Sequence, residues 1–320
     1  MKVVDSILEV IGNTPMLRLN QFAKQGDAEI LAKLEYLNPS GSIKDRIAKY
    51  MIEAAEKEGA INPGNTIVEA STGNTGTALA FVAAVKGYKM LIFGPKLTLS
   101  DERVHIMKAY GAQIEIIELD DEKDLPDLSV HGGVIEIVPR KMCLEMETKN
   151  QGVWWARQFS NEHNVNAHKE TTAVEILEQT EGKLDAFVAS VGTGGTLYGV
   201  AQVLKKHNPD IHIVGVEPAS SPLLDVEKQN IPIIKGITDG LILDIIDSGL
   251  VDEIIPVDDE TAIQTAHHLS EKEGLFCGIS SGANVYASQI IAEKLGRSHR
   301  VVTVLPDNRD RYLFKEKYTT

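Results

Sequence analysis

Short β-rich runs alternate with longer amphipathic stretches along most of the chain. The β-rich runs predict strands at residues 29–34, 66–69, 90–93, 113–118, 186–191, 212–216 and 301–305. Between them, apolar residues recur at helical spacing, which predicts helices at 46–58, 75–85, 99–110, 171–179, 197–206, 259–272 and 281–295. Strand–helix alternation predicts an α/β fold with largely parallel, twisted sheets flanked by helices on both faces.

Composition narrows the class of protein. A chain of 320 residues can bury a large core and has room for two domains. Its net charge of −14 argues against nucleic acid and anionic membrane surfaces as partners, because both need basic patches. No apolar run approaches the roughly 18 residues of a membrane span. The opening residues lack the apolar stretch of a signal peptide, so a cytoplasmic location is expected.

The cysteines and histidines give no sign of a metal or a disulfide framework. Cys143 and Cys277 are far apart in the sequence and are expected to behave as small apolar residues. The nine histidines show no metal-binding spacing. We therefore expect no metal site.

A lysine follows a tight turn near the N-terminus. Residues 38–46 read NPSGSIKDR, in which Pro39, Ser40 and Gly41 form a turn and Ser42 is a good N-cap. This arrangement places Lys44 in the first turn of a helix. Taken alone, such a lysine is usually a surface residue, so its interpretation depends on the other motifs.

A glycine-rich turn joins a predicted strand to a predicted helix. Gly192, Thr193, Gly194, Gly195 and Thr196 follow the strand at 186–191 and precede the helix at 197–206. This geometry aims backbone N–H groups and the positive end of a helix at an anion such as phosphate. The run has neither the full GxGxxG spacing nor a P-loop lysine, and alone it is equally consistent with a turn that binds nothing.

A third polar turn, Ser71–Gly76, links the strand at 66–69 to the next helix. It contains Ser71, Thr72, Asn74 and Thr75. Hydroxyls and free N–H groups at a helix start suit a carboxylate. The alternative is a polar turn that caps the helix and binds no ligand.

Taken together and in this order, the three motifs resemble the cysteine synthase and cystathionine β-synthase family, the β-replacement branch of fold-type II enzymes that use pyridoxal 5'-phosphate. The resemblance spans nearly the whole chain. It implies that Lys44 forms a Schiff base with the cofactor and moves the substrate's α-proton. It also implies that residues 192–196 bind the cofactor's phosphate, and that Asn74 hydrogen-bonds its phenolic oxygen while the turn around Asn74 grips the substrate carboxylate.

The resemblance extends to two later positions and to the domain organisation. It implies that Ser280 meets the pyridine nitrogen and that Gln158 helps to bind the substrate carboxylate. A neutral serine, unlike a carboxylate, does not hold that nitrogen protonated, which favours β-elimination over transamination. We expect a smaller, mobile α/β domain at 45–150 and a larger cofactor-binding domain made of 1–44 and 151–320. The resemblance also implies a homodimer.

Two segments depart from the family pattern. Asp239 lies in GITDG at 236–240, where the family usually has Gly-Ile-Gly. One interpretation is a loop aspartate whose side chain hydrogen-bonds its own backbone. The other is a general base, with which the enzyme would release sulfide from cysteine instead of making cysteine. Arg309 stands where the family usually has a small residue, and it either alters the charge near the cofactor or points to solvent.

The leading hypothesis is a cysteine synthase-like enzyme of β-replacement or β-elimination on serine- or cysteine-type amino acids. It acts through an aminoacrylate intermediate, with O-acetylserine or a related substrate and sulfide or a thiol. The alternative is a hydrogen sulfide-producing cysteine lyase that uses Asp239. A serine or threonine dehydratase fits less well, because its turn usually has His where Thr75 stands and its phosphate loop carries more glycines. A non-catalytic paralogue is expected to lose the lysine or the glycine loop, and this chain has both.

Overall fold

The computed structural model describes residues 3–118, 137–220, 245 and 248–313, in which the strands form two sheets. The larger sheet contains β1 (Met16–Arg18), β2 (Glu29–Lys33), β10 (Arg300–Val304), β7 (Ala186–Ser190), β8 (His212–Pro218) and β9 (Glu253–Val257), in that spatial order. The smaller sheet has the order β5 (Gln113–Ile117), β4 (Lys89–Pro95), β3 (Thr66–Ala70) and β6 (Val153–Trp155). Every pair is parallel except β1 and β2.

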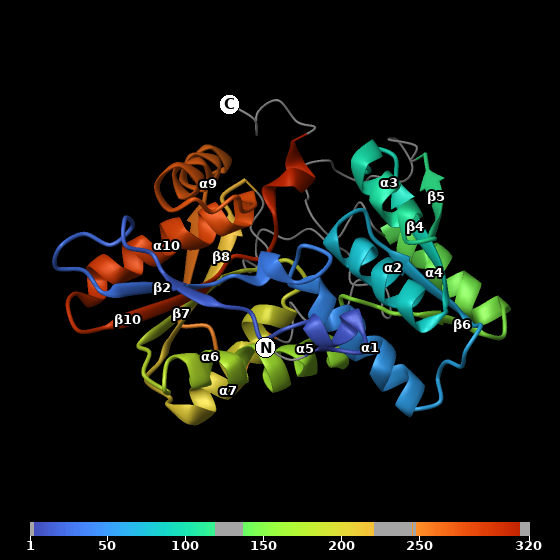
Figure 1. Ribbon diagram of the computed structural model, residues 1–320, viewed down its shortest axis with the longest axis horizontal. Helices are drawn as coiled ribbons and strands as arrows, with labels where there is room; N and C mark the ends of the chain where they lie inside the picture. The colour runs from blue at the N-terminus through green and yellow to red at the C-terminus, as the bar shows by residue number, and fades with distance from the viewer. Residues whose placement is uncertain (1–2, 119–136, 221–244, 246–247, 314–320) are drawn as a thin grey trace.

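Helices cover both faces of the larger sheet (Figure 1). α9 (Asp259–Glu273) and α10 (Ile279–Leu295) pack on one face, whereas α6 (Ala173–Gln179) and α7 (Gly195–His207) pack on the other. Successive strand side chains alternate between these faces. In β2, for example, Ile30 joins the core beneath α9 and α10, and Leu31 joins the core beneath α6 and α7. Burial on both faces explains the nearly continuous apolar runs in the sequence.

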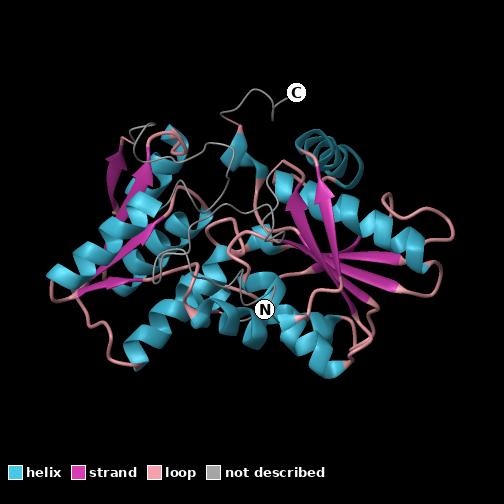
Figure 2. Ribbon diagram, turned by 180° about the vertical axis from the view of Figure 1, so that it is seen from behind, coloured by secondary structure: helices cyan, strands magenta, loops and turns pink. Residues whose placement is uncertain are grey.

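The smaller sheet is built in the same way and lies at the other end of the molecule (Figure 2). α1 (Lys44–Lys57), α2 (Asn74–Lys86) and α3 (Asp101–Ala109) contribute to the core on one face, which includes Ile67 of β3. α4 (Ile137–Lys149) covers the other face, where its Cys143 packs with Val68. The predicted fold class, largely parallel sheets flanked by helices, is confirmed.

Each predicted strand and helix overlaps an observed one, but several elements were missed. β1 and β6 are only three residues long, and the short α5 (Glu162–Ala167) continues into a π-helix at His168–Thr172. β9 and α4 contain prolines, which argue against regular structure in a sequence. Pro256 is tolerated because β9 lies at the sheet edge, and Pro139 because it sits in the first turn of α4.

The division into two domains at residues 45 and 150 stays a prediction. β6, which pairs with β3 in the smaller sheet, begins at Val153. Both cysteines are buried, as expected of small apolar residues, and neither forms a disulfide with another described residue. Within the described ranges, no helix combines the length and apolar character needed to cross a membrane. In the same part of the chain, no group of three or more His, Cys, Asp or Glu side chains is placed to hold a metal.

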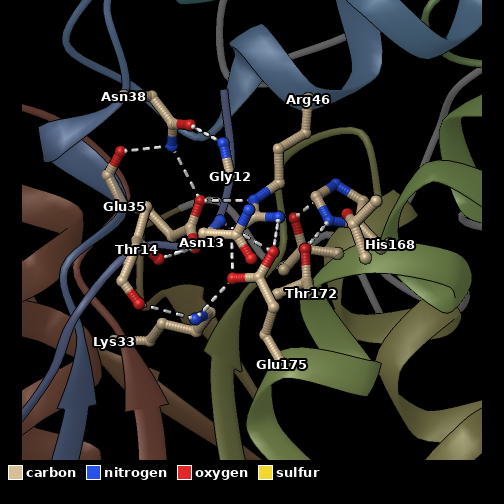
Figure 3. A network of polar contacts seen from close by, with 12 residues as sticks. Gly12, Asn13, Thr14, Lys33, Glu35, Asn38, Arg46, His168, Thr172 and Glu175 are labelled. Atoms are coloured by element: carbon tan, nitrogen blue, oxygen red, sulfur yellow. Dashed lines mark hydrogen bonds and ion pairs between the residues drawn. The ribbon is translucent and has the colours of Figure 1, made fainter. Parts of the chain in front are cut away.

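Four charged side chains form a buried network beneath the start of α1 (Figure 3). The Arg46 guanidinium lies 2.8 Å from Oε2 of Glu35 and 2.6 Å from Oε1 of Glu175. The Lys33 Nζ lies 2.7 Å from the second Glu175 oxygen. The two positive and two negative groups balance, which is the condition for burying charge without a large net penalty.

Neutral partners complete this charged network and tie it to the N-terminal segment. The Thr14 hydroxyl donates to Glu35, and the Asn13 backbone N–H donates to Glu175. Asn38 connects the carboxylate of Glu35 to the backbone N–H of Gly12. Segments far apart in sequence are thereby fixed around the first turn of α1.

Glu175→Gln tests how much the charged network contributes to stability. Burial alone would raise the pKa of Glu175, but hydrogen bonds and the charges of Arg46 and Lys33 lower it from 4.5 to about 2. A lowered pKa stabilises the folded state fully above pH 4.5, and this contribution is lost as the pH falls towards 2. We expect the variant to lose about 3 kcal/mol of unfolding free energy at neutral pH.

Urea unfolding at a series of pH values measures this loss. The difference in unfolding free energy between wild type and Glu175→Gln should become smaller below pH 4.5. Glu145→Gln is the matched control, because Glu145 pairs with Lys149 on the surface and both side chains are largely exposed. It should leave the unfolding midpoint unchanged. A difference in unfolding free energy between wild type and Glu175→Gln that does not vary with pH would contradict the stabilising role of the Glu175 charge.

Candidate active site

A cavity of about 320 Å³ opens where the carboxyl ends of the larger sheet's strands meet the first turns of several helices. This edge of a parallel sheet is where ligands commonly bind in α/β folds. Most of the predicted cofactor residues line the cavity. They are Lys44, Asn74, Gly192, Thr193, Gly194, Thr196 and Ser280. The structure therefore brings the glycine turn at 192–196 together with two motifs that precede it by more than a hundred residues in the sequence.

Lys44 is the first residue of α1 and its side chain lines the cavity. The Ser42 hydroxyl accepts the backbone N–H of Lys44, and the N–H of Ile43 donates to the Pro306 carbonyl at 2.8 Å. Burial lowers the pKa of the Lys44 amine to about 8, against the opposing charge of Asp307. No hydrogen bond or ion pair to its Nζ is present among the described residues. The amine is thus partly neutral near physiological pH and available as a nucleophile.

The glycine turn leads directly into α7, which begins at Gly195. Gly194 has a φ of 89°, a left-handed conformation that favours glycine. A Cβ on Gly195 would lie 2.0 Å from Oδ1 of Asn164, so the helix start can approach Asn164 only because this residue has no side chain. Asn164 in turn donates to Thr193 Oγ1 at 3.1 Å. The backbone N–H groups of the turn and of the first helical residues are thereby held at the cavity wall.

His168 supports this turn from behind, and the sequence analysis missed it. Its Nε2 lies 3.2 Å from the Thr196 hydroxyl, and its Nδ1 lies 2.9 Å from Thr172 Oγ1. Burial, aided by the charges of Lys44 and Arg46, lowers the pKa of His168 well below its usual value. The imidazole is therefore neutral and serves as a hydrogen-bonding spacer. No sequence signal marks it, because it depends on an irregular π-turn.

The polar turn before α2 contributes Asn74 to the cavity. The Asn74 amide donates to Oδ2 of Asp307 at 2.6 Å, and its oxygen accepts from Arg311 at 2.8 Å. The second Asn74 N–H has no partner in the part of the chain that the structure describes, which leaves it to serve a ligand. The Ser71 hydroxyl instead accepts the N–H of Gly76 and so caps α2.

The other predicted substrate residues lie behind or beside the cavity wall. Of the described residues that form this wall, Asn74 alone belongs to the turn that also holds Thr72 and Thr75. Gln158 is buried, and its side-chain amide donates to the Ala70 carbonyl at 3.1 Å. It therefore supports the strand end that precedes Ser71. The substrate-binding roles of Ser71, Thr72, Thr75 and Gln158 stay predictions.

The remaining predicted positions differ in outcome. Ser280 lines the cavity in the first turn of α10. Asp239 lies outside the described residues. Arg309 does not point to solvent: it is buried, donates to the Cys277 carbonyl at 3.2 Å and lies over the Phe276 ring.

Sequence reasoning also missed four ionisable residues of the cavity wall. They are Glu217, Asp259, Asp307 and Tyr312. Asp307 and Tyr312 belong to the segment after β10, which the sequence analysis singled out only for Arg309.

Comparison with known proteins identifies the family. A family model described as pyridoxal-phosphate dependent enzyme matches residues 7–307. The chain belongs to this family. A cysteine synthase of Staphylococcus aureus is 43% identical over 319 residues, which span 99% of this chain and 98% of the relative. The predicted resemblance to cysteine synthases is confirmed.

Solved structures agree with this assignment. A hydrogen sulfide-producing enzyme of Fusobacterium nucleatum has a TM-score of 0.84 and 36% identity, covering 98% of this chain and 99% of that one. A cysteine synthase of Entamoeba histolytica has a TM-score of 0.85 and 36% identity, covering 100% and 92%. An O-ureido-L-serine synthase has a TM-score of 0.85 and 34% identity, covering 99% and 96%.

The residues of the cavity fit a phosphorylated aldehyde cofactor. An amine with a lowered pKa suits covalent attachment to the aldehyde. The glycine turn offers backbone donors and a helix N-terminus to the phosphate. A Cβ at Gly192 would meet no atom within 4 Å, so this part of the turn leaves space for a ligand. The site accordingly suits pyridoxal phosphate, the cofactor of the family.

Gly195→Ala tests the close approach of the turn to Asn164. The new methyl group would overlap Asn164 Oδ1 and force the amide to release Thr193. We expect the unfolding free energy of the cofactor-free protein to fall by about 1–3 kcal/mol, together with a loss of affinity for pyridoxal phosphate. Urea unfolding and equilibrium dialysis measure the two effects.

Gly192→Ala is the matched control for Gly195→Ala. It lies in the same turn, but its new methyl group would point into open space, so the unfolding free energy should stay unchanged. Equal stability of the two alanine variants would refute the packing role of Gly195.

Proposed function

We propose that the protein catalyses a β-replacement on a serine-type amino acid, as a cysteine synthase does. Its substrates are O-acetylserine or a related activated serine, and sulfide or a thiol. The observation that carries the proposal is the convergence of Lys44, the glycine turn and Ser280 on one cavity at the sheet edge. The names of the relatives support it, since cysteine synthases and an O-ureido-L-serine synthase are among them.

Each group around the cavity has a defined task in this proposal. When bound, pyridoxal phosphate supplies an electron sink for the bond-breaking at the substrate's Cα. Lys44 holds the cofactor through Nζ, and the same Nζ then takes the α-proton of the substrate. The turn at 192–196 anchors the phosphate through backbone N–H groups. The Ser280 hydroxyl would hold the ring nitrogen without adding a negative charge, which favours loss of the β-substituent over transamination.

The substrate carboxylate is assigned to the turn before α2. Its hydroxyl-bearing residues and the fresh N–H groups of α2 suit an anion, and the Asn74 amide keeps one N–H for a ligand. Gln158 supports this turn through the Ala70 carbonyl. A β-substituent that leaves and a nucleophile that replaces it both need access from the open side of the cavity.

Direct assay tests the direction of the reaction. We expect cysteine from O-acetyl-L-serine and sulfide, with no product when Lys44 is replaced by alanine, because that variant lacks the amine. Mass spectrometry after borohydride reduction should map the attached cofactor to Lys44. Pyruvate from serine alone would instead indicate a dehydratase, and a protein that binds no cofactor would indicate a non-catalytic paralogue.

A second candidate function is the release of sulfide from L-cysteine. It is favoured by Asp239, which places a carboxylate in a segment where the family usually has glycine, and by the relative described as hydrogen sulfide-producing. In this case, Asp239 acts as the base that activates the incoming water or thiol.

Asp239→Asn separates the two candidates. It should suppress sulfide release from L-cysteine by about tenfold or more while the visible absorbance of the bound cofactor stays unchanged. Sulfide electrode readings and absorbance spectra measure these two properties. If the variant releases as much sulfide as the wild type, Asp239 has no role in this reaction. If the wild type releases no sulfide from L-cysteine, the second candidate is rejected and the synthesis of cysteine remains the proposed function.

The location, oligomeric state and domain motion of the enzyme are proposed from the resemblance to the family and from composition. We place it in the cytoplasm as a homodimer, with a smaller domain at 45–150 that moves when substrate binds. Sedimentation equilibrium tests the dimer, cell fractionation tests the location, and hydrogen exchange with and without substrate tests the motion.

A further inference from the structure

Asp307 is a buried carboxylate in the cavity wall with no role assigned above. It lies just after β10, and its side chain is 1% exposed. The surrounding backbone is fixed from two sides. The Asp307 carbonyl accepts the N–H of Gly278 at 2.8 Å, and the N–H of the next residue, Asn308, donates to Gly41 at 3.2 Å. The carboxylate is therefore held in place by the segments that also carry Lys44 and Ser280.

The two carboxylate oxygens of Asp307 have different surroundings. Oδ2 accepts hydrogen bonds from Asn74 and from the Tyr312 hydroxyl. Oδ1 is buried and has no hydrogen-bond partner among the described residues. A Cβ on Gly278 would lie 2.1 Å from Oδ1, so the carboxylate packs directly against the chain that leads into α10. A buried and incompletely bonded carboxylate costs stability, which points to a task in the site.

The electrostatic partner of Asp307 within the cavity is Lys44. Burial lowers the pKa of Lys44 to about 8, and the charge of Asp307 acts in the opposite sense. The two groups do not form a direct ion pair, so the lysine keeps its freedom to move. Burial also raises the pKa of Asp307, although the hydrogen bonds from Tyr312 and Asn74 act against this.

We propose that Asp307 is a positioning residue that orients the Asn74 amide and supplies the negative charge facing the Lys44 ammonium when Lys44 carries the substrate's proton. This inference rests on the proposed function, because it assigns that proton to Lys44. Asp307 Oδ2 accepts hydrogen bonds from both Asn74 and Tyr312, so one N–H of the Asn74 amide is held by the carboxylate and the second is left for a ligand. One carboxylate thus couples a ligand-binding amide to the charge state of the reactive amine.

Other ionisable groups near Lys44 and Asp307 also contribute to the electrostatic potential around the pair. Arg311 and Arg103 lower the pKa of Asp307 from the C-terminal segment and from α3, respectively. His168 faces Lys44 from the π-helix but is neutral. The remaining ionisable groups on the cavity wall are Glu217 at the end of β8, Asp259 at the start of α9, and Tyr312.

Titration of Lys44 in the full-length cofactor-free protein tests the inference without relying on turnover. Competitive acetylation across a pH series, followed by mass spectrometry of the peptide that contains Lys44, gives the midpoint of its titration. Asp307→Asn removes the facing charge and keeps the side-chain shape. The Lys44 midpoint should therefore fall by about one pH unit or more. Asp310→Asn is the matched control, because Asp310 lies three residues away on the exposed surface and should leave the midpoint unchanged.

Two further variants guard against a purely structural effect. Tyr312→Phe removes one hydrogen bond but keeps the carboxylate, so the Lys44 midpoint should stay near the wild-type value. Asp307→Ser is a second neutral variant and should repeat the shift of Asp307→Asn even if the asparagine variant folds poorly. In the cofactor-loaded enzyme, Asp307→Asn should lower kcat by about tenfold, with a smaller change in KM.

The outcomes separate this inference from the function it rests on. An unchanged Lys44 midpoint in both neutral Asp307 variants would overturn the inference, whatever reaction the enzyme performs. An equal shift in Asp310→Asn would overturn it as well, because the effect would then be a general one of net charge. A shifted midpoint in an enzyme that forms no cysteine and releases no sulfide would leave the coupling standing and overturn the proposed function instead.

Discussion

The buried ion network around Arg46 is the constraint on which the site depends. Arg46 follows Lys44 by two positions in α1, so the two side chains leave the helix on different sides. Arg46 is held between the carboxylates of Glu35 and Glu175, whereas Lys44 lines the cavity. Because each buried charge needs its partner, the first turn of α1 has little freedom to shift or rotate. The reactive amine is positioned by an interaction that lies outside the cavity.

The cavity itself follows from the topology of the larger sheet. Parallel strands end at the same edge, so the turns after β7, β8 and β10 all arrive there. The same edge receives the first turns of α1, α2, α7 and α10, whose unpaired N–H groups favour anions. Phosphate and carboxylate binding therefore need few charged side chains. This is consistent with a chain of net charge −14 that uses pyridoxal phosphate, an anionic cofactor.

The segment after β10 connects the parts of the site that the motifs define separately. Asp307 and Arg311 both bond Asn74, which opens α2 beside the smaller sheet. Arg103 of α3 lies 5.3 Å from the Tyr312 ring centre and donates to the Thr72 carbonyl. Displacement of the helices that pack on the smaller sheet would thus act directly on the carboxylate that faces Lys44. The proposed motion of the domain at 45–150 would be coupled to the protonation of the amine through this short segment.

Local features of the chain were enough to predict the fold class, whereas the prediction of the site also needed the resemblance to a known family. Apolar runs marked the buried strands, and turns rich in glycine and hydroxyl residues marked the helix starts that surround the cavity. The turn at 192–196 was marked by its place between a strand and a helix and Lys44 by its place after a tight turn, whereas the resemblance to the family supplied their expected roles and added Ser280. The short elements β1, β6 and α5 were missed because too few residues carry their periodicity, and β9 and α4 because each contains a proline that only its edge or first-turn position permits.

Tertiary structure alone decided which polar side chains serve the site and which support it. In the fold the Ser71 hydroxyl and the Gln158 side-chain amide bond the backbone beside the cavity, a supporting contact that the sequence did not indicate, and their substrate-binding roles stay predictions. His168 and Asp307 carried no sequence signal, since an isolated histidine or aspartate looks the same on a surface as in a core. Each of them makes a decisive contact with a residue more than 25 positions away along the chain, His168 with Thr196 and Asp307 with Asn74. Sequence determines the local chemistry, whereas burial and the resulting pKa shifts require the packed chain.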